Sequence, residues 1–359
     1  MSKEKIAFVC DTPYQLFVSV SILLSNRNLV KYQKDLYIDL KRCKKASMYN
    51  YYQNILHEKI FDNIYIVNSL SAYNRIYNKI EWLFPEISLK VGSKWKIPPN
   101  INYKIIWVSG PFMLQRNIIN HFNCKTVYFF EDGTGSYSGR IGVNLLNRRG
   151  RLIQKITGRG PKYIYPQYVY LFRPELYEGE YRNVIEKIEF PYGSGRIFNR
   201  IFVNSESDYN YKGKRIVYLT QPITNKYPEK DSKVLDAISR FSDNIIIRPH
   251  PQDLDKDYSG FEIDKSKSLW ELVCSKYITD DSILLGLCST AQVTSKLLLN
   301  KEPYIIFTYH LYDSDLSKRF DSLVESVTKI YKKKEKVIVV KSFDELAMVI
   351  ERILNQEKE

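Results

Sequence analysis

Two short apolar runs of the chain, residues 127–130 and 245–247, end abruptly in ionisable residues. The first runs into Glu131 and Asp132, and the second runs into Arg248 and His250. In an α/β protein, this pattern is typical of a buried strand that ends at an active-site loop. One strand end offers carboxylates and the other offers an imidazole. If the two ends face each other across a cleft, they form an acid/base pair.

The two carboxylates are adjacent, so they cannot both point to the same side of an extended chain. We expect one of Glu131 and Asp132 to enter the cleft, where a carboxylate of raised pKa serves as a general base. The other is then solvated or caps a helix. Gly133 allows a left-handed backbone and a close approach to a ligand. The alternative is a plain Asp-Gly turn.

The histidine lies between two prolines, Pro249 and Pro251. Prolines on both sides hold the backbone extended, so the imidazole of His250 is fixed in place. A histidine fixed beyond a strand end can donate a proton to a leaving phosphate or hold it electrostatically. Arg248 can contact the same phosphate. The alternative is a structural histidine in a proline-rich turn.

Three other strand ends carry small polar residues. Ser289 and Thr290 stand between a predicted strand and a predicted helix. This position is typical of a helix cap, and the same geometry forms an anion site. Gln221 follows another strand and is expected in the same cleft.

At the first strand–helix junction, three polar residues are predicted to bind acceptor hydroxyls: Asp11, Thr12 and Gln15. Cys10 is not expected to be a nucleophile, because no activating histidine is near it in sequence.

Apolar strands that alternate with amphipathic helices position these residues. The predicted strands are 6–10, 36–40, 64–67, 105–108, 127–130, 215–219, 244–247, 283–285, 304–307 and 337–340, and the predicted helices are 15–24, 233–241, 268–275, 291–299 and 343–354. This rhythm predicts parallel, doubly wound sheets. We therefore expect an α/β, GT-B-like fold of two Rossmann-type domains, residues 1–200 and 210–359, facing a central cleft. The hinge is placed at 199–214, and residues 139–195 are predicted to be long loops with one or two helices.

The composition and net charge limit which classes of binding partner are expected. The 359 residues are 44% hydrophobic and 26% charged, which is typical of a globular protein. The net charge of +14 indicates an anionic partner, such as nucleotide phosphates or an anionic membrane face. No nucleic-acid-binding motif is found. The basic run 332–336 is either a solvated turn or a membrane contact.

The remaining composition argues against metals and membrane spans. Five cysteines without CxxC spacing and four scattered histidines favour neither disulfides nor a metal site. No apolar stretch reaches the roughly 20 residues that span a bilayer. The expected location is cytoplasmic, with peripheral attachment to the inner membrane face.

The order of four motifs resembles the bacterial sialyltransferases of glycosyltransferase family 52, which act on lipooligosaccharide and capsule. The motifs are the junction at residues 10–15, the Glu131–Gly133 element, His250 with Pro251, and the Ser289–Thr290 pair. The resemblance implies an inverting GT-B enzyme that needs no metal or other cofactor. It transfers sialic acid from CMP-sialic acid to a galactoside-type hydroxyl.

The same resemblance assigns roles to residues. Asp132 deprotonates the acceptor hydroxyl, His250 stabilises or protonates the departing CMP phosphate, and Ser289 and Thr290 hold that phosphate. The residues expected on the donor side are Arg248, Pro251, Ser289, Thr290, Gln221 and Gly133. Those expected on the acceptor side, which is a glycan or lipid-linked glycan, are Asp11, Thr12, Gln15 and Glu131.

Two other functions stay open. A CDP-glycerol or CDP-ribitol polyol-phosphotransferase of wall polymer synthesis carries a similar RPHP element and a Ser/Thr phosphate site. Such enzymes usually have an Asp just before that Ser/Thr pair, where this chain has Leu287 and Cys288. The third function is a non-catalytic, membrane-associated polysaccharide assembly protein. A homodimer is compatible with all three.

Overall fold

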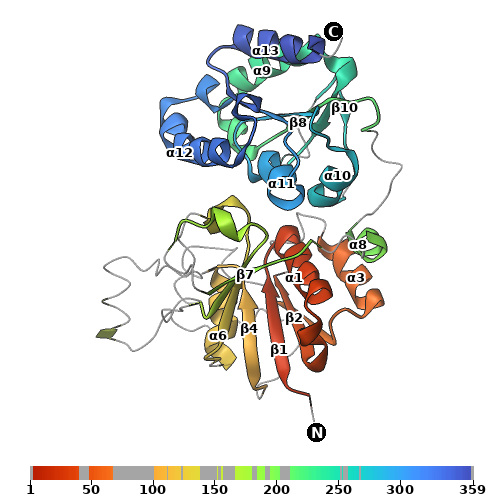
Figure 1. Ribbon diagram of the computed structural model, residues 1–359, viewed down its shortest axis with the longest axis vertical. Coiled ribbons are helices and arrows are strands. Elements are labelled where there is room, and N and C mark those ends of the chain that lie inside the picture. Colours follow the sequence, from red (N-terminus) through yellow and green to blue (C-terminus); the bar gives the residue numbers. More distant parts are fainter. Residues whose placement is uncertain are drawn as a thin grey trace. The chain divides into compact units, whose positions relative to one another are not determined.

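The computed structural model describes residues 3–39, 48–67, 101–110, 112–122, 124–137, 152, 155–156, 166–179, 184–190, 195–202, 211–250, 253, 258–266 and 268–356. The chain forms two compact units, Met1–Phe202 and Val203–Glu359. Each unit has a parallel sheet flanked by helices (Figure 1).

The first unit has a seven-stranded sheet in the order β3-β2-β1-β4-β5-β6-β7. Its strands are β1 (Lys5–Cys10), β2 (Gln33–Asp39), β3 (Asn63–Val67), β4 (Tyr103–Val108), β5 (Val127–Phe130), β6 (Tyr168–Leu171) and β7 (Ile185–Lys187). Its helices are α1 (Pro13–Ser25), α3 (Met48–Glu58), α6 (Met113–Phe122) and α8 (Gly195–Phe202), with 3-10 turns η1 (Arg27–Lys31), η3 (Thr134–Tyr137) and η4 (Pro174–Leu176). The strand order reverses between β1 and β4, which makes the sheet doubly wound.

The second unit has a six-stranded sheet in the order β10-β9-β8-β11-β12-β13. Its strands are β8 (Ile216–Leu219), β9 (Ile245–Arg248), β10 (Glu262–Ile263), β11 (Ile283–Gly286), β12 (Tyr304–Phe307) and β13 (Val337–Val339). Its helices are α9 (Pro228–Ser239), α10 (Trp270–Tyr277), α11 (Thr290–Leu299), α12 (Ser314–Ile330) and α13 (Phe343–Asn355), with 3-10 turns η7 (Pro222–Lys226), η8 (Ser242–Asn244), η9 (Tyr309–Leu311) and η10 (Lys334–Lys336). Here the order reverses between β8 and β11.

The central strands contain continuous apolar runs, as expected for strands whose two faces are both covered by helices. In β1, residues 6–10 have no exposed surface, and the same holds for residues 245–247 of β9. Helix α1 begins where the sequence provides a cap: the Thr12 hydroxyl accepts a hydrogen bond from the Gln15 backbone N–H at 3.2 Å. Pro13 then takes the first helical position, where its missing N–H is not needed.

The ten predicted strands and five predicted helices are confirmed, with ends that move by a few residues. Strands β6, β7 and β10 and helices α3, α6, α8 and α12 were not predicted. Strands β6 and β7 lie in the segment 139–195, and most of the rest of that segment lies outside the described residues. Within the described parts of the chain, no helix has the length and apolar character needed to cross a membrane.

Candidate functional site

In both units, the predicted polar residues lie at the carboxyl edge of the sheet. Sheets of this topology bind ligands outside that edge, where the strand order reverses. In the first unit this place lies between the ends of β1 and β4, next to β5. In the second unit it lies between the ends of β8 and β11, next to β9.

Asp132 is the second residue after β5 and is half-buried. Its Oδ1 accepts a hydrogen bond from Gln15 Nε2 at 2.9 Å, and its backbone N–H donates to Ser136 Oγ at 2.7 Å. Gly133 then has φ 81°, a left-handed conformation that favours glycine. The turn therefore fixes where the Asp132 carboxylate lies.

Glu131 points the other way, as the alternation of side chains predicts. It is fully buried, and its carboxylate accepts hydrogen bonds from Tyr14 Oη at 2.6 Å, from the Phe172 backbone N–H at 2.9 Å and from Tyr137 Oη. Burial raises the pKa of the Glu131 carboxyl, against the three donors, which lower it. This placement corrects the predicted acceptor-binding role: Glu131 anchors the loop from inside.

Two other predicted acceptor contacts are also turned inward. Gln15 has no exposed surface, and its Oε1 accepts the Asp11 backbone N–H at 2.6 Å. Asp11 is 2% exposed, and its Oδ2 accepts Gln115 Nε2 at 3.2 Å. Only Thr12, the cap of α1, keeps partial exposure among the residues predicted at this junction. The structure therefore corrects the predicted direct contact of Asp11 and Gln15 with an acceptor.

Sequence reasoning missed Gln115, Tyr14, Tyr137 and Ser109. Gln115 is fully buried, and its Oε1 accepts the backbone N–H groups of Ser109 at 2.9 Å and Gly110 at 3.0 Å. A polar residue near the start of a helix whose boundaries were not predicted carries no signal in one sequence. Tyr14, by contrast, lies inside the predicted junction motif.

In the second unit, His250 lies just beyond β9 and is half-buried. Its backbone N–H donates to Thr220 Oγ1 at 2.9 Å, which ties it to the end of β8. Burial lowers the pKa of the His250 imidazole, while the nearby Asp253 raises it. The ring is therefore mostly neutral at pH 7. Pro251 lies outside the described residues.

Arg248, the last residue of β9, makes its side-chain contacts within the second unit. Its guanidinium makes an ion pair with the buried Asp264, donates to the Ser268 backbone carbonyl and lies 5.3 Å from the centre of the Trp270 ring. Asp264 also accepts Tyr211 Oη at 2.7 Å. The contacts that the structure shows for Arg248 are those of a structural ion pair, and the phosphate contact stays a prediction.

At the start of α11, Ser289 and Gln292 form a capping box. Ser289 Oγ accepts the Ala291 backbone N–H at 3.2 Å, and Gln292 Oε1 accepts the Ser289 backbone N–H at 2.9 Å. Because these two backbone N–H groups donate to side chains of the capping box, they do not point to an anion. The Ser289 hydroxyl accepts in this cap and still has its own proton to donate, and the Thr290 side chain beside it is also half-buried.

The strands on either side of this reversal approach each other closely. A Cβ on Gly286 would lie 2.8 Å from the Leu219 carbonyl oxygen, which is shorter than any normal contact. Gln221 then bridges the two strand ends, because its Nε2 donates to the Cys288 carbonyl at 2.8 Å. Gln221 thus stabilises the carboxyl edge of the sheet between β8 and β11.

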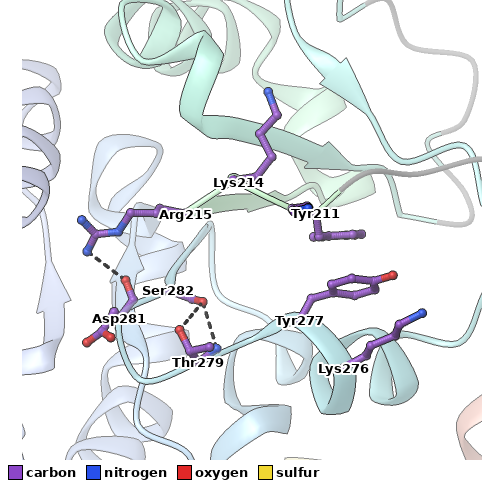
Figure 2. Close-up of a pocket in the computed structure, with 10 residues that line it drawn as sticks. Tyr211, Lys214, Arg215, Lys276, Tyr277, Thr279, Asp281 and Ser282 are labelled. Carbon is purple, nitrogen blue, oxygen red and sulfur yellow. Dashed lines mark hydrogen bonds between the residues drawn. The ribbon is translucent and has the colours of Figure 1, made fainter.

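A pocket of about 500 Å³ opens at the opposite, amino edge of the second sheet (Figure 2). It is lined by residues 211–215 before β8, by the end of α10 and by Thr279, Asp281 and Ser282 before β11. The rings of Tyr211 and Tyr277 stack at 5.3 Å, and Arg215 donates to the Asp281 backbone carbonyl at 3.1 Å. None of the predicted site residues lines it, so it is not the predicted site.

The described residues contain no group of three His, Cys, Asp or Glu side chains placed to hold a metal ion. Cys10 is fully buried, and burial raises the pKa of its thiol; the same cause raises the pKa of Cys288 to about 12. Both are therefore thiols at neutral pH, as expected for cysteines without a nucleophilic role.

No protein-family model matches the sequence, and no curated protein matches it. Solved structures do match. A spinosyn forosaminyltransferase is 10% identical over 99% of this chain and 91% of its own, with a TM-score of 0.55. A UDP-N-acetylglucosamine 2-epimerase is 11% identical over 100% and 89%, with a TM-score of 0.53. A spinosyn rhamnosyltransferase in complex with thymidine diphosphate is 9% identical over 98% and 92%, with a TM-score of 0.52.

At these identities the likeness shows the fold alone. It is the GT-B fold of glycosyltransferases and sugar epimerases, made of two doubly wound parallel α/β domains, and the fold prediction is confirmed. The resemblance to family 52 stays a prediction, because none of these three structures is named as a sialyltransferase.

Proposed function

We propose that the chain is an inverting glycosyltransferase that moves a sugar from a nucleotide-sugar donor to a hydroxyl group of a glycan acceptor. The observation that carries the proposal is the placement of Asp132. Its carboxylate lies beyond a central strand, is held by the Gln15 amide at 2.9 Å, and keeps partial exposure. A fixed, accessible carboxylate is what removal of a hydroxyl proton requires.

The proposed reaction is a single displacement. The acceptor oxygen attacks the anomeric carbon of the donor sugar while its proton passes to Asp132. The bond from that carbon to the phosphate oxygen breaks, and the phosphate leaves with the electron pair. Attack from the face opposite the phosphate inverts the anomeric configuration.

The departing phosphate is assigned to the second unit. The imidazole of His250, mostly neutral because burial lowers its pKa, donates a hydrogen bond to the phosphate oxygen. The dianionic phosphate then favours the protonated ring, which completes the charge stabilisation. Ser289 already accepts a hydrogen bond through Oγ, so its own O–H is free to donate. We assign a second hydrogen bond to this phosphate to the neighbouring Thr290 hydroxyl.

For the donor we propose CMP-sialic acid, on the order of the four motifs in the sequence, and for the acceptor a galactoside of a capsule or lipooligosaccharide precursor. The competing donors are UDP and dTDP sugars, the classes named with the epimerase and the rhamnosyltransferase above. Peripheral attachment to an anionic membrane is part of the proposal, since Lys332, Lys333 and Lys334 are exposed.

The first experiment is thermal stability with CMP, CDP, UDP, GDP and dTDP, each with and without manganese. A ligand at a hundred times its Kd adds about 2.7 kcal/mol to the free energy of unfolding, so one nucleotide raises Tm. A rise in Tm with CMP that is the same with and without manganese supports sialyl transfer. A rise with CDP favours the polyol-phosphotransferase instead, and a rise with UDP, GDP or dTDP favours a hexose or deoxysugar donor.

The second experiment measures turnover with the donor so identified. Asp132→Asn and His250→Ala each lower kcat at least about a hundredfold, the usual worth of a general acid or base. Circular dichroism checks that both variants are folded. Unchanged turnover in both would refute the assignment of these roles.

A further inference from the structure

Gln15 lies between two strand ends with both ends of its amide bonded. It is the third residue of α1 and is fully buried. On one side its Oε1 faces the Asp11 backbone N–H at 2.6 Å, beyond β1. On the other side its Nε2 faces Asp132 Oδ1 at 2.9 Å, beyond β5. The side chain therefore joins the end of the central strand to the carboxylate proposed as the base.

The orientation of this amide is fixed by its partners. A backbone N–H can only donate, so the Gln15 atom that faces Asp11 must be the oxygen. The amino group is then the end that meets the Asp132 carboxylate. An amide N–H that donates to a carboxylate favours its ionised form and fixes its direction.

A second glutamine fixes the first. Gln115 Oε1 accepts the backbone N–H groups of Ser109 at 2.9 Å and Gly110 at 3.0 Å, beyond β4. Its Nε2 is therefore the end that reaches Gln15 Oε1, at 3.2 Å. Gln15 Oε1 thus has two donors, and a flipped Gln15 would place its amino group against both.

The second unit has a glutamine, Gln292, at the corresponding helix position, and its amide nitrogen has different partners. Gln292 is also the third residue of its helix. Whereas Gln15 Oε1 accepts the Asp11 backbone N–H, one residue before the N-cap of α1, Gln292 Oε1 accepts the backbone N–H of the N-cap residue Ser289 itself. Its amino group, however, donates to backbone carbonyls, among them Leu284 O at 3.3 Å and Ile306 O at 3.1 Å. Capping a helix therefore does not require a carboxylate partner, and the bond from Gln15 to Asp132 needs its own explanation.

We propose that Gln15 is a positioning residue for Asp132, and that Gln115 is a second positioning residue that acts through Gln15. The proposal rests on the proposed function, in which Asp132 is the base. It replaces the acceptor contact that the sequence predicts for Gln15.

Two variants test the contacts of the Gln15 amide oxygen and amide nitrogen separately. Gln15→Glu keeps an oxygen for the Asp11 N–H and replaces the donor to Asp132 with an anionic oxygen, while Gln15→Met removes both contacts. The titratable groups placed around the Glu131–Asp132 pair are Asp11, Cys10, Tyr14 and Tyr137. None of them changes in either variant.

Loss of the amide donor lowers kcat about tenfold to a hundredfold at pH 7 and leaves the KM for the donor unchanged. It also moves the acidic limb of the pH–rate profile upward by about one pH unit in Gln15→Met. In Gln15→Glu the limb moves further, because a like charge disfavours the carboxylate. A wild-type kcat and pH profile in both variants would overturn the proposal.

The relay is tested with a double variant. Gln115→Met moves the acidic limb in the same direction by a smaller amount. If Gln115 acts through Gln15, the double variant shifts no more than Gln15→Met alone. Additive shifts would overturn the role given to Gln115.

Tyr103→Phe is the matched control for lost buried polar contacts. It removes the hydrogen bond from Tyr103 Oη to Asp35 Oδ2, 2.6 Å long, at the amino edge of the same sheet. It lowers Tm and leaves the pH profile in place. A shifted profile in this control would mean that general destabilisation causes the effect, which also overturns the proposal.

A crystal structure separates this inference from the proposed function. If the wild-type protein transfers no sugar from any donor, the proposed function fails while the geometry remains testable. In Gln15→Met the Asp132 carboxylate then turns away from its wild-type position, while the backbone of residues 127–137 stays. An unmoved carboxylate would overturn the positioning role.

Discussion

Removing the buried carboxylate of Glu131 tests whether it anchors the loop that carries Asp132. In Glu131→Ala, three donors lose their acceptor: the Phe172 backbone N–H and the hydroxyls of Tyr14 and Tyr137. In Glu131→Gln, the amide oxygen can accept from Phe172 and Tyr137, and the Tyr14 hydroxyl can turn to accept from the new amino group. Alanine should therefore be much more harmful than glutamine.

The magnitude follows from the donors. An unsatisfied buried donor costs about 1–3 kcal/mol, and the cavity left by the side chain adds to this cost. The tyrosine hydroxyls can rotate, so the Phe172 N–H and the cavity set the lower limit. We expect Glu131→Ala to lower the free energy of unfolding of the first unit by about 3–5 kcal/mol. At about 2–4 °C per kcal/mol, its Tm falls by on the order of 10 °C.

The assay is calorimetry, which resolves the two units if they melt separately. Glu131→Gln should lose about 1 kcal/mol or less at pH 5. The pKa of Glu131 is raised in the folded state, so the folded protein binds the proton more tightly. Stability from this carboxyl is present below its unfolded pKa and is lost as pH rises through the folded pKa. The glutamine variant should gain on the wild type between pH 5 and pH 8. A wild-type Tm in Glu131→Ala would refute the anchoring role.

Three more predictions follow from the second unit. Gly286→Ala should cost about 1–3 kcal/mol, because its Cβ would lie 2.8 Å from the Leu219 carbonyl; Gly195→Ala, with nothing within 4 Å, is its control in denaturant melts. The pKa of His250 is lowered in the folded state, so stability should fall as pH drops from about 6.5 through the folded pKa, and His250→Gln should flatten this slope. Arg248→Met should destabilise by about 3–5 kcal/mol, because it leaves Asp264 buried without its cation, yet keep the donor Kd in calorimetric titration of the folded protein. A weaker donor Kd would instead support the phosphate contact that the sequence predicts for Arg248.

The fold was predictable because its central strands are buried on both faces. Such strands form continuous apolar runs, as residues 6–10 and 245–247 do, and helices alternate with them. The elements that were missed lack this signal. Strand β7 is Ile-Glu-Lys at the sheet edge, and β10 has two residues. Helix α8 combines arginines with aromatic residues in eight positions, too short a span for a period to stand out.

The sequence predicted which strand ends carry the candidate site residues, but it did not predict the direction in which each side chain points. Glu131, Asp132, His250 and Ser289 all lie at carboxyl edges, as expected from apolar runs that end in polar residues. Which side each residue faces depends on where its strand stops. Arg248 is the last residue of β9 and faces Asp264, while His250 lies beyond the strand.

At two helix starts the sequence predicts the cap but not the hydrogen-bond partner of the capping glutamine. Thr12 with Gln15, and Ser289 with Gln292, both have the hydroxyl-x-x-glutamine spacing of a capping box, so sequence alone indicates that a helix starts there. The glutamine oxygen accepts a backbone N–H at the helix start in both cases, from Asp11 just before Thr12 and from Ser289 itself. The amino group goes to whatever acceptor lies beside it: carbonyls of β11 and β12 for Gln292, and the carboxylate beyond β5 for Gln15. For Gln15 that partner is 117 residues away along the chain, and a local motif holds no information about it. Sequence analysis could therefore select Gln15 but could not predict its contact with Asp132, which depends on how distant strands pack in the sheet.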